Sequence, residues 1–188
     1  LLNALNGGFI APSPGGDAVR NPNTLPTGRN LFGINAEATP GVRAWDEGKA
    51  LAKSTLDRYY RKHGEYPRKV SYTFWAGEFI ETEGATLAQA LYMLGVAPVR
   101  DGMNRVTDLR LIPSAELGRP RIDVVVQTSG QLRDVAASRL ELLTKAVKMV
   151  AQSENDTCGN YVSEGTVESE RILLEKGFSP KEARELST

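Results

Sequence analysis

The chain has 188 residues, of which 40% are hydrophobic, enough for a folded domain and too many for a wholly disordered chain. Its 23 Lys and Arg side chains balance its 23 Asp and Glu side chains, so no net charge favours nucleic acid or an anionic membrane. The single cysteine and single histidine exclude an internal disulfide and a metal site built on two histidines of this chain.

The two ends of the sequence indicate a piece of a longer protein. The chain begins Leu1-Leu2-Asn3, without an initiator Met and without the basic segment of a signal peptide, and it ends within or just after a helical pattern. No apolar run approaches the roughly 18–20 residues that a membrane-spanning helix needs. We therefore expect no transmembrane segment, and the lone Cys158 agrees with a reducing, cytoplasmic setting.

Residues 15–30 contain turn formers and short polar groups, with only Val19 and Leu25 as large apolar side chains. Such a segment is either a disordered tail or an ordered loop built for polar recognition, since proline fixes φ and glycine permits close approach. Its polar anchors are charged side chains within or after the segment: Asp17, Arg20, Arg29 and Arg43. Two alternatives stay open here, ligand recognition and an internal pair between Arg29 and Asp17.

The next stretch alternates helix and strand signals. Apolar or small residues recur at helical spacing over 44–59, and His63-Gly64 with Pro67 ends that helix. Residues 70–76 are aromatic and β-branched, which predicts a strand, and a loop over 77–84 follows. Thr86 with Gln89 forms a capping-box pattern that opens a short helix ending at Gly95.

The second half of the chain predicts three more strands, at 96–99, 106–112 and 122–128. The continuous apolar run of the last one indicates a buried parallel strand. A long helix follows Ser129-Gly130 as far as Val150, a polar loop covers 153–160, and two helices complete the chain at 161–175 and 179–187.

This alternation predicts an α/β fold in which a mostly parallel central sheet of about four strands is flanked by helices. We expect an ordered N-terminal loop over 1–40, an α/β core over 41–152 and a helical C-terminal part over 153–188. Ligands of such sheets bind beyond the carboxyl ends of the strands, where the loops 77–84 and 129–134 would meet and where the loop 15–30 could cover the edge.

The turn from Ser129 to Asp134 is the first candidate site. A strand that ends in a small residue and Gly130 before a helix presents unpaired backbone N–H groups, which can hold an anion. Arg133 could pair with a carboxylate of a ligand. The alternative is an ordinary strand-to-helix turn in which Arg133 and Asp134 are solvated or bridge to a neighbour.

The acidic loop is the second candidate, because it carries Glu78, Glu81 and Glu83 within six residues. Clustered carboxylates can bind a divalent cation or take protons from a substrate. The alternative is a solvated acidic loop. Trp75, directly before it, is expected in the core.

Other chemistries find little support. His63 is typical of a helix C-terminus and Cys158 has no histidine beside it, so neither is expected in a metal site or as a nucleophile. Ser129 lacks the Gly-x-Ser-x-Gly pattern of hydrolases. The sequence contains no P-loop and no Gly-x-Gly-x-x-Gly, so we expect nucleotide binding to lie outside this chain.

Several motifs resemble one family. They are Pro14-Gly15-Gly16-Asp17, Leu25-Pro26-Thr27-Gly28-Arg29-Asn30, Glu81-Thr82-Glu83-Gly84, the run Leu117-Gly118-Arg119-Pro120-Arg121-Ile122-Asp123-Val124, and Ser129-Gly130-x-x-Arg133-Asp134. In order and across nearly the whole chain, they resemble the large subunit of cobaltochelatase (CobN type) and of magnesium chelatase.

The resemblance implies an internal segment of a much longer subunit that binds a tetrapyrrole and inserts a divalent metal (cobalt, magnesium or iron). ATP would be bound by an AAA+ ATPase partner, and accessory chelatase subunits and the remainder of the large subunit would be further partners. Metal insertion removes two pyrrole protons and needs anchors for the ring's side chains. We therefore expect Glu81 and Glu83 as catalytic acid/base groups. The expected substrate anchors are Arg20, Arg29, Asn30, Arg133 and Asp134.

Two alternatives remain within this resemblance. One is a haem-handling paralogue that binds or demetallates haem, and the other is a non-catalytic module of the large subunit that docks its partners. The segment lacks most of the ring-binding cavity in either case, so we expect no chelatase activity from it alone.

Overall fold

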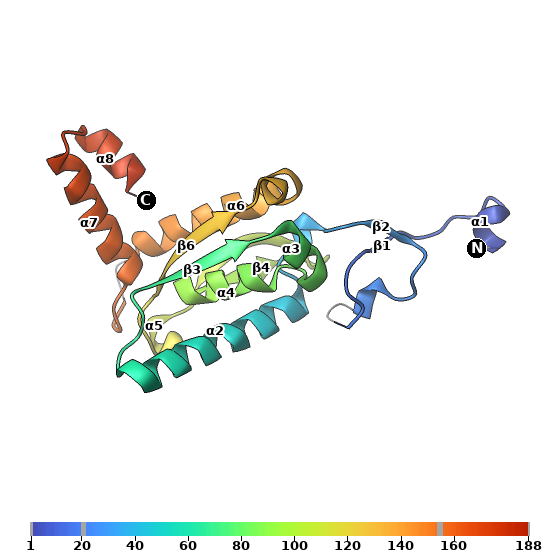
Figure 1. Cartoon of the computed structure of the whole chain (residues 1–188), viewed down its shortest axis with the longest axis horizontal. Helices are drawn as coiled ribbons and strands as arrows, with labels where there is room; N and C mark the ends of the chain where they lie inside the picture. Colours follow the sequence, from blue (N-terminus) through green and yellow to red (C-terminus); the bar gives the residue numbers. More distant parts are fainter. Residues whose placement is uncertain (1, 20–21, 154–155, 188) are drawn as a thin grey trace.

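The computed structural model describes residues 2–19, 22–153 and 156–187, so the candidate anchor Arg20 lies outside the described residues. Figure 1 shows a central α/β body, an N-terminal segment that extends from one end of it, and a C-terminal pair of helices at the other end. The elements in chain order are α1 (Leu2–Leu5), β1 (Ser13–Pro14), η1 (Pro22–Thr24), β2 (Asn30–Phe32), η2 (Ala36–Ala38), α2 (Val42–His63), β3 (Lys69–Phe74), α3 (Ala76–Thr82), α4 (Ala85–Leu94), β4 (Val96–Arg100), β5 (Val106–Leu111), α5 (Ser114–Leu117), β6 (Asp123–Thr128), α6 (Gly130–Ala151), α7 (Tyr161–Glu175) and α8 (Pro180–Leu186).

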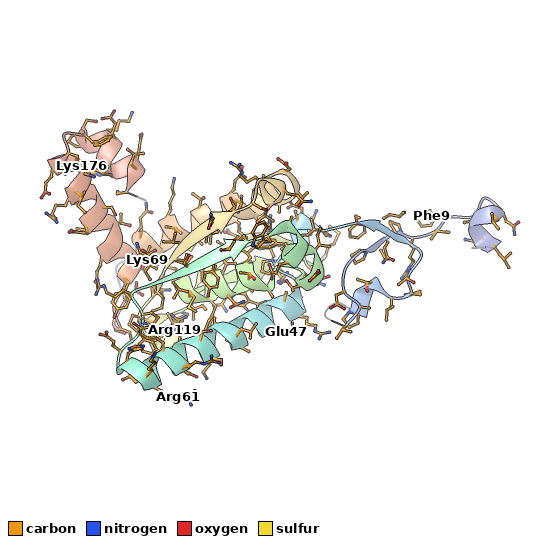
Figure 2. The ribbon with its side chains drawn as sticks, viewed as in Figure 1. Phe9, Glu47, Arg61, Lys69, Arg119 and Lys176 are labelled. Atoms are coloured by element: carbon orange, nitrogen blue, oxygen red, sulfur yellow. The ribbon has the colours of Figure 1, made fainter. Side chains whose placement is uncertain are left out.

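The N-terminal segment is held by polar contacts rather than by a core. β1 and β2 form a short parallel pair in which Ser13 lies opposite Asn30. The Asn30 side-chain amide donates to the carbonyl oxygens of Pro14 (2.6 Å) and Thr24 (3.0 Å). Apolar side chains of this segment are exposed, and Phe9 lies far out along it (Figure 2). Polar contacts thus hold the described part of the loop, which buries little apolar surface, and its ordering stays a prediction.

Helix α2 packs against α4 along a stripe of small side chains. Ala44, Gly48, Ala52 and Leu56 recur at four-residue spacing and are buried. A Cβ atom at Gly48 would lie 2.6 Å from both the Ala85 carbonyl oxygen and the Ala88 Cβ, so only glycine permits this approach. The helix ends at Gly64 in the left-handed conformation, which places His63 in the last turn as expected.

The strands pair in twos. β3 and β6 are parallel, with Lys69 opposite Asp123 and Phe74 opposite Thr128, whereas β4 and β5 form an antiparallel hairpin. The α/β class, with parallel strand pairs flanked by helices, is confirmed. The four expected strands do not form one sheet, because the tight turn after Asp101 returns the chain directly onto β4 and separates the hairpin from the parallel pair.

Three local expectations are corrected. Residues 77–84 are not an extended loop, because α3 occupies most of them. Gly84, at φ 83°, precedes the first residue of α4, and the Thr82 hydroxyl accepts the Ala85 N–H at 3.0 Å, so Thr86 is not the cap. β6 is parallel as expected but is covered on one face only, since Val125 is 48% exposed.

The core lies between the parallel pair and the helices α4 and α6. Its main cluster joins Phe74, Phe79, Leu91, Leu94 and Leu132 with further aliphatic side chains. Each of these five side chains is fully buried. The carboxyl ends of β3 and β6 therefore stand on a rigid base, with α3 and the first turn of α6 above them.

The C-terminal pair of helices begins with well-formed caps. Asn160 accepts the N–H groups of Val162 and Ser163, and Ser179 with Glu182 forms a reciprocal capping box on α8. These helices match the expected positions closely. The division of the chain into 1–40, 41–152 and 153–188 stays a prediction.

Candidate functional site at the end of the helix α3

The two arginines of the motif 117–124 are structural. Arg119 donates to the carbonyl oxygens of Tyr92 (2.5 Å) and Met93 (3.1 Å), and its guanidinium lies 4.8 Å from the centre of the Tyr92 ring. Burial lowers the pKa of Arg119. Figure 2 shows this residue inside the body, close to α2. Arg119 thus caps the C-terminal end of α4 and is not available to a ligand.

Arg121 completes the same cap. Its guanidinium donates to the carbonyl oxygens of Gly95 (2.7 Å) and Ile112 (2.9 Å), and its Nε lies 2.6 Å from the Asp156 carboxylate. The side chains of Arg121 and Asp156 are 3% and 7% exposed. The motif therefore fixes α4, the β4–β5 hairpin and the loop before α7 to one another, and the motif's function is architectural.

Glu83 lines a cavity of about 520 Å³, together with Gly41, Arg43, Asp46, Arg100 and Asn104. It adopts a left-handed conformation (φ 54°) between α3 and α4, and its carbonyl oxygen accepts the Gly41 N–H at 3.0 Å. A Cβ atom at Gly41 would lie 2.3 Å from Glu83 Oε2. Glycine at 41 therefore lets the Glu83 carboxylate lie against the start of α2.

Arg100 supplies a fixed positive charge in this cavity, in addition to Arg43. It reaches the carbonyl oxygens of Pro40 (2.5 Å) and Asn104 (3.2 Å), so its position is fixed from two sides. Burial lowers the pKa of Arg100, and the negative charges of Asp46 and Glu83 act in the opposite direction. Two carboxylates, the fixed guanidinium of Arg100 and the guanidinium of Arg43 thus share one polar cavity.

The other two acidic side chains of the cluster have different surroundings. Glu81 lies on the exposed side of α3, where the backbone of Gly16 approaches it. Glu78 Oε1 accepts the hydroxyls of Thr82 (2.8 Å) and Thr86 (2.7 Å), while its buried Oε2 has no hydrogen-bond partner among the described residues. Glu78 therefore fixes the junction of α3 and α4 beneath Glu83.

The N-terminal loop reaches this region through α3. A Cβ atom at Gly16 would lie 3.0 Å from the Ile80 carbonyl oxygen, and one at Gly33 would lie 3.3 Å from the Ile80 side chain. Arg29 is half-buried, and its Nε is buried without a hydrogen-bond partner in the described chain. Asp17 instead accepts the Val19 N–H at 2.9 Å. The loop thus contacts α3, while Asn30 is engaged in holding the loop together.

The turn at Ser129 lies at the carboxyl end of β6. The Ser129 hydroxyl accepts the Leu132 N–H at 3.2 Å, as an ordinary helix cap does. Arg133 and Asp134 are both exposed on the first turn of α6. Trp75, at the equivalent end of β3, is 61% exposed, so its expected place in the core is wrong. It is displaced because β3 turns into α3 at Trp75 and its side chain continues the outer face of the strand.

Sequence reasoning missed Asp46 and Arg100. Asp46 lies one turn into an amphipathic helix, and Arg100 ends a strand, so each looks like a solvated surface charge in the sequence. Only the packing of η2, α2 and the hairpin brings them beside Glu83. Among the described residues, no three His, Cys, Asp or Glu side chains come together as a metal site. No described helix is both long and apolar enough to cross a membrane.

Comparison with known proteins decides the family. The family model described as CobN/Magnesium Chelatase matches residues 1–188. The chain belongs to this family. The large-subunit resemblance expected from the motifs is thereby confirmed.

Relatives of this CobN/magnesium chelatase segment include both branches of the family. Magnesium-chelatase subunit ChlH of Oryza sativa subsp. indica is 41% identical over 184 residues, which are 97% of this chain and 13% of the relative. Aerobic cobaltochelatase subunit CobN of Sinorhizobium is 36% identical over 189 residues, 100% of this chain and 15% of the relative. The solved catalytic subunit of cobaltochelatase from Mycobacterium tuberculosis is 40% identical with a TM-score of 0.79, covering 97% of this chain and 15% of that chain. The chain thus spans less than a sixth of these proteins.

Proposed function

We propose that this chain is a segment of a chelatase large subunit that inserts a divalent metal, cobalt or magnesium, into a tetrapyrrole ring. The names of the relatives support this proposal, since they are magnesium chelatase and cobaltochelatase subunits. The observation that carries it is the cavity in which Glu83 and Asp46 lie beside Arg100. The metal ion is here a substrate, delivered to the ring rather than retained by the protein.

The chemistry of metal insertion matches this set of groups. A divalent metal replaces two pyrrole protons, so a carboxylate near the ring is required to accept them. Glu83 is our first candidate for that base, because its backbone is fixed between two helices and its side chain lines the same cavity as the Arg100 guanidinium. Glu81 lies on the exposed side of α3, two residues before Glu83, and is the candidate for passing protons to solvent.

The anchors for the ring's acidic side chains would come from the N-terminal loop and from α6. Arg29 is the best placed, since its buried Nε has an unused donor among the described residues. Asn30 supports the loop that carries Arg29, and Arg133 and Asp134 would lie at the rim. Arg20 remains part of the proposal from the sequence motif. Arginine suits this role because its planar fork binds carboxylates in a bidentate manner.

Partner proteins complete the proposal. ATP would bind to a separate AAA+ ATPase subunit, and accessory chelatase subunits would act with it, in the cytoplasm. The 188 residues alone would be inactive, because a cavity of about 520 Å³ at the surface encloses only part of a reaction chamber. The remainder of the large subunit would provide the other walls.

The test uses the full-length large subunit with its ATPase partner. The variant Glu83→Gln keeps the shape of the side chain and removes the base, and Glu65→Gln, in the exposed turn after α2, is the matched control. Absorbance titration with protoporphyrin, hydrogenobyrinate diamide and haem measures ring binding, and metal insertion is measured with cobalt and magnesium. We expect Glu83→Gln to bind the ring normally and to lose at least about 100-fold in insertion rate.

Other outcomes separate the alternatives. Insertion at the wild-type rate by Glu83→Gln would remove Glu83 from the mechanism. A wild-type subunit that binds haem alone and inserts neither metal would refute the proposed function in favour of haem handling. An unchanged ring titration of Arg29→Ala, together with wild-type insertion by Glu83→Gln, would make the segment a docking module.

A further inference from the structure

The parallel pair β3–β6 has one face that the described elements cover only at its amino end. Alternate side chains of both strands point to this face and are exposed: Lys69, Ser71, Thr73, Trp75, Val125 and Gln127. The opposite face packs on α4 through Val70, Tyr72 and Phe74 and their β6 neighbours. In Figure 1 α7 begins beside the amino ends of the two strands, and no described helix lies over the rest of their near face.

Both outer edges of the pair also lack a neighbouring strand in the described chain. The Asp123 N–H donates to the Arg68 carbonyl oxygen, and the Ser129 N–H donates to the Phe74 carbonyl oxygen. The backbone N–H groups of the odd-numbered residues of β6 therefore point toward β3. Because donors alternate along a parallel strand, the N–H groups of Val126 and Thr128 point outward from β6. By the same register, those of Ser71 and Thr73 point outward from β3.

A two-stranded parallel sheet with one bare face is not a stable end state. Parallel sheets are almost always covered on both faces, and two strands alone are marginal. The uncovered face carries Trp75 and Val125, which are 61% and 48% exposed. α7 covers only the amino end of this face, where the Cβ position of Gly165 lies 3.4 Å from Asp123 Oδ2. The rest of the face therefore requires a cover from outside the described residues.

We infer that a βα unit of the same large subunit, from outside residues 1–188, docks here. Its strand would extend the sheet at the outer edge of β3, and its helix would lie over Trp75 and Val125. One unit can do both, since a parallel strand and its crossover helix are consecutive in the chain. The length of chain required is present in the family, because this segment covers 13–15% of the relatives. The inference rests on the proposed function for the existence of that longer subunit.

The docked unit also has a consequence for the site. It would lie over the carboxyl ends of β3 and β6, next to Trp75, α3 and the first turn of α6. This completes a doubly wound arrangement, in which helices cover both faces and the strand ends open into a crevice.

Hydrogen exchange on the full-length large subunit, read by mass spectrometry at single-residue resolution, tests the inference. We expect the amides of Ser71 and Thr73 to exchange at least about 100-fold more slowly than unstructured peptide amides. Any smaller slowing would overturn the inference, because an edge without a partner leaves these amides open to water. The inward-facing Tyr72 amide is the internal reference for an intact strand.

A pair of variants adds a second measurement. Ser71→Pro removes the outward donor, which a solvent-facing edge tolerates, whereas Ser71→Ala keeps it. We expect only Ser71→Pro to accelerate exchange at Thr73, by about tenfold or more, and equal exchange in the two variants would count against a docked strand. The same preparation is titrated with protoporphyrin. Ring binding with open edge amides would refute only the docking, and protected amides without binding of any ring would refute only the proposed function.

Discussion

The buried pair of Arg121 and Asp156 offers a sharp test of how this segment is held together. The variant Arg121→Met keeps the apolar stem and removes the guanidinium. It leaves the Ile112 carbonyl oxygen without its guanidinium donor, and the Gly95 carbonyl oxygen keeps only the Ile112 N–H. It also removes the ion-pair partner of the Asp156 carboxylate, whose side chain is only 7% exposed. Breaking a buried pair in this way costs about 3–5 kcal/mol in the free energy of unfolding.

The lower part of that range is expected here. Asp156 Oδ2 keeps two donors after the substitution, the Ser153 hydroxyl at 2.5 Å and the Asn160 amide at 2.9 Å. We therefore expect Arg121→Met to lower the free energy of unfolding by about 3 kcal/mol. Urea titration followed by circular dichroism at 222 nm measures it, provided that the slope of the transition is unchanged.

Two further variants make the test specific. Arg171→Met removes an exposed arginine that pairs with Glu168 and Glu175 on α7, and we expect the urea midpoint to stay unchanged. Asp156→Asn combined with Arg121→Met is expected to cost at least about 1 kcal/mol less than the sum of the two single changes. Additive changes, or an effect of Arg121→Met below about 1 kcal/mol, would refute the capping role derived for this arginine.

Two other changes probe the same core. Gly95→Ala places a Cβ atom 2.4 Å from Arg121 Nη1 and 2.8 Å from Leu117 Cδ2 at φ 75°, whereas Gly64→Ala has φ 76° and no neighbour within 4 Å. Gly64→Ala should lower the free energy of unfolding by about 1–2 kcal/mol because of its backbone conformation alone. Gly95→Ala should lower it by clearly more. Equal losses in urea titrations of the two variants would show that the Arg121 cap adjusts to the added Cβ atom without cost. Burial raises the pKa of Tyr72 from its ordinary value to about 12, because the charged form loses its hydration. The unfolded state then releases this proton at lower pH than the folded state, so the contribution of Tyr72 is fully present below pH 10 and is lost as the pH rises towards about 12. Tyr72→Phe should reduce the loss of stability over this interval, as measured by urea midpoints at a series of pH values, and an unchanged slope would contradict the burial of its hydroxyl.

Much of the local structure follows from the sequence. The spacing of Ala44, Ala52 and Leu56 specifies α2, and the β-branched run of β6 specifies a strand, because side-chain periodicity directly reflects which face is buried. The last two helices carry their own caps at Asn160 and Ser179. The helix α3 is harder to predict, since residues 77–84 contain three glutamates between two glycines and have little helical periodicity. The helix forms there because Phe79 packs into the core.

The candidate site shows the limit of this reasoning. The acidic cluster was visible in the sequence, but its three glutamates have three different surroundings: Glu78 is held by threonines, Glu81 is exposed, and Glu83 lines a cavity. Arg119 and Arg121 stand in a specific family motif, yet they bind backbone carbonyls rather than a ligand. The motif identifies Arg119 and Arg121 as residues typical of the family, and only the contacts of their side chains show that their role is structural.

The sequence by itself determined the family, the α/β class and most element positions, because these depend on short-range patterns and on motifs that lie contiguously in the chain. Only the tertiary structure decided which charges meet. Asp46, Glu83 and Arg100 come from three separate elements, and their mutual electrostatics arise only when η2, α2 and the hairpin pack together. It also revealed the bare face of β3–β6, since the covering of a sheet is a property of layers and not of any one strand.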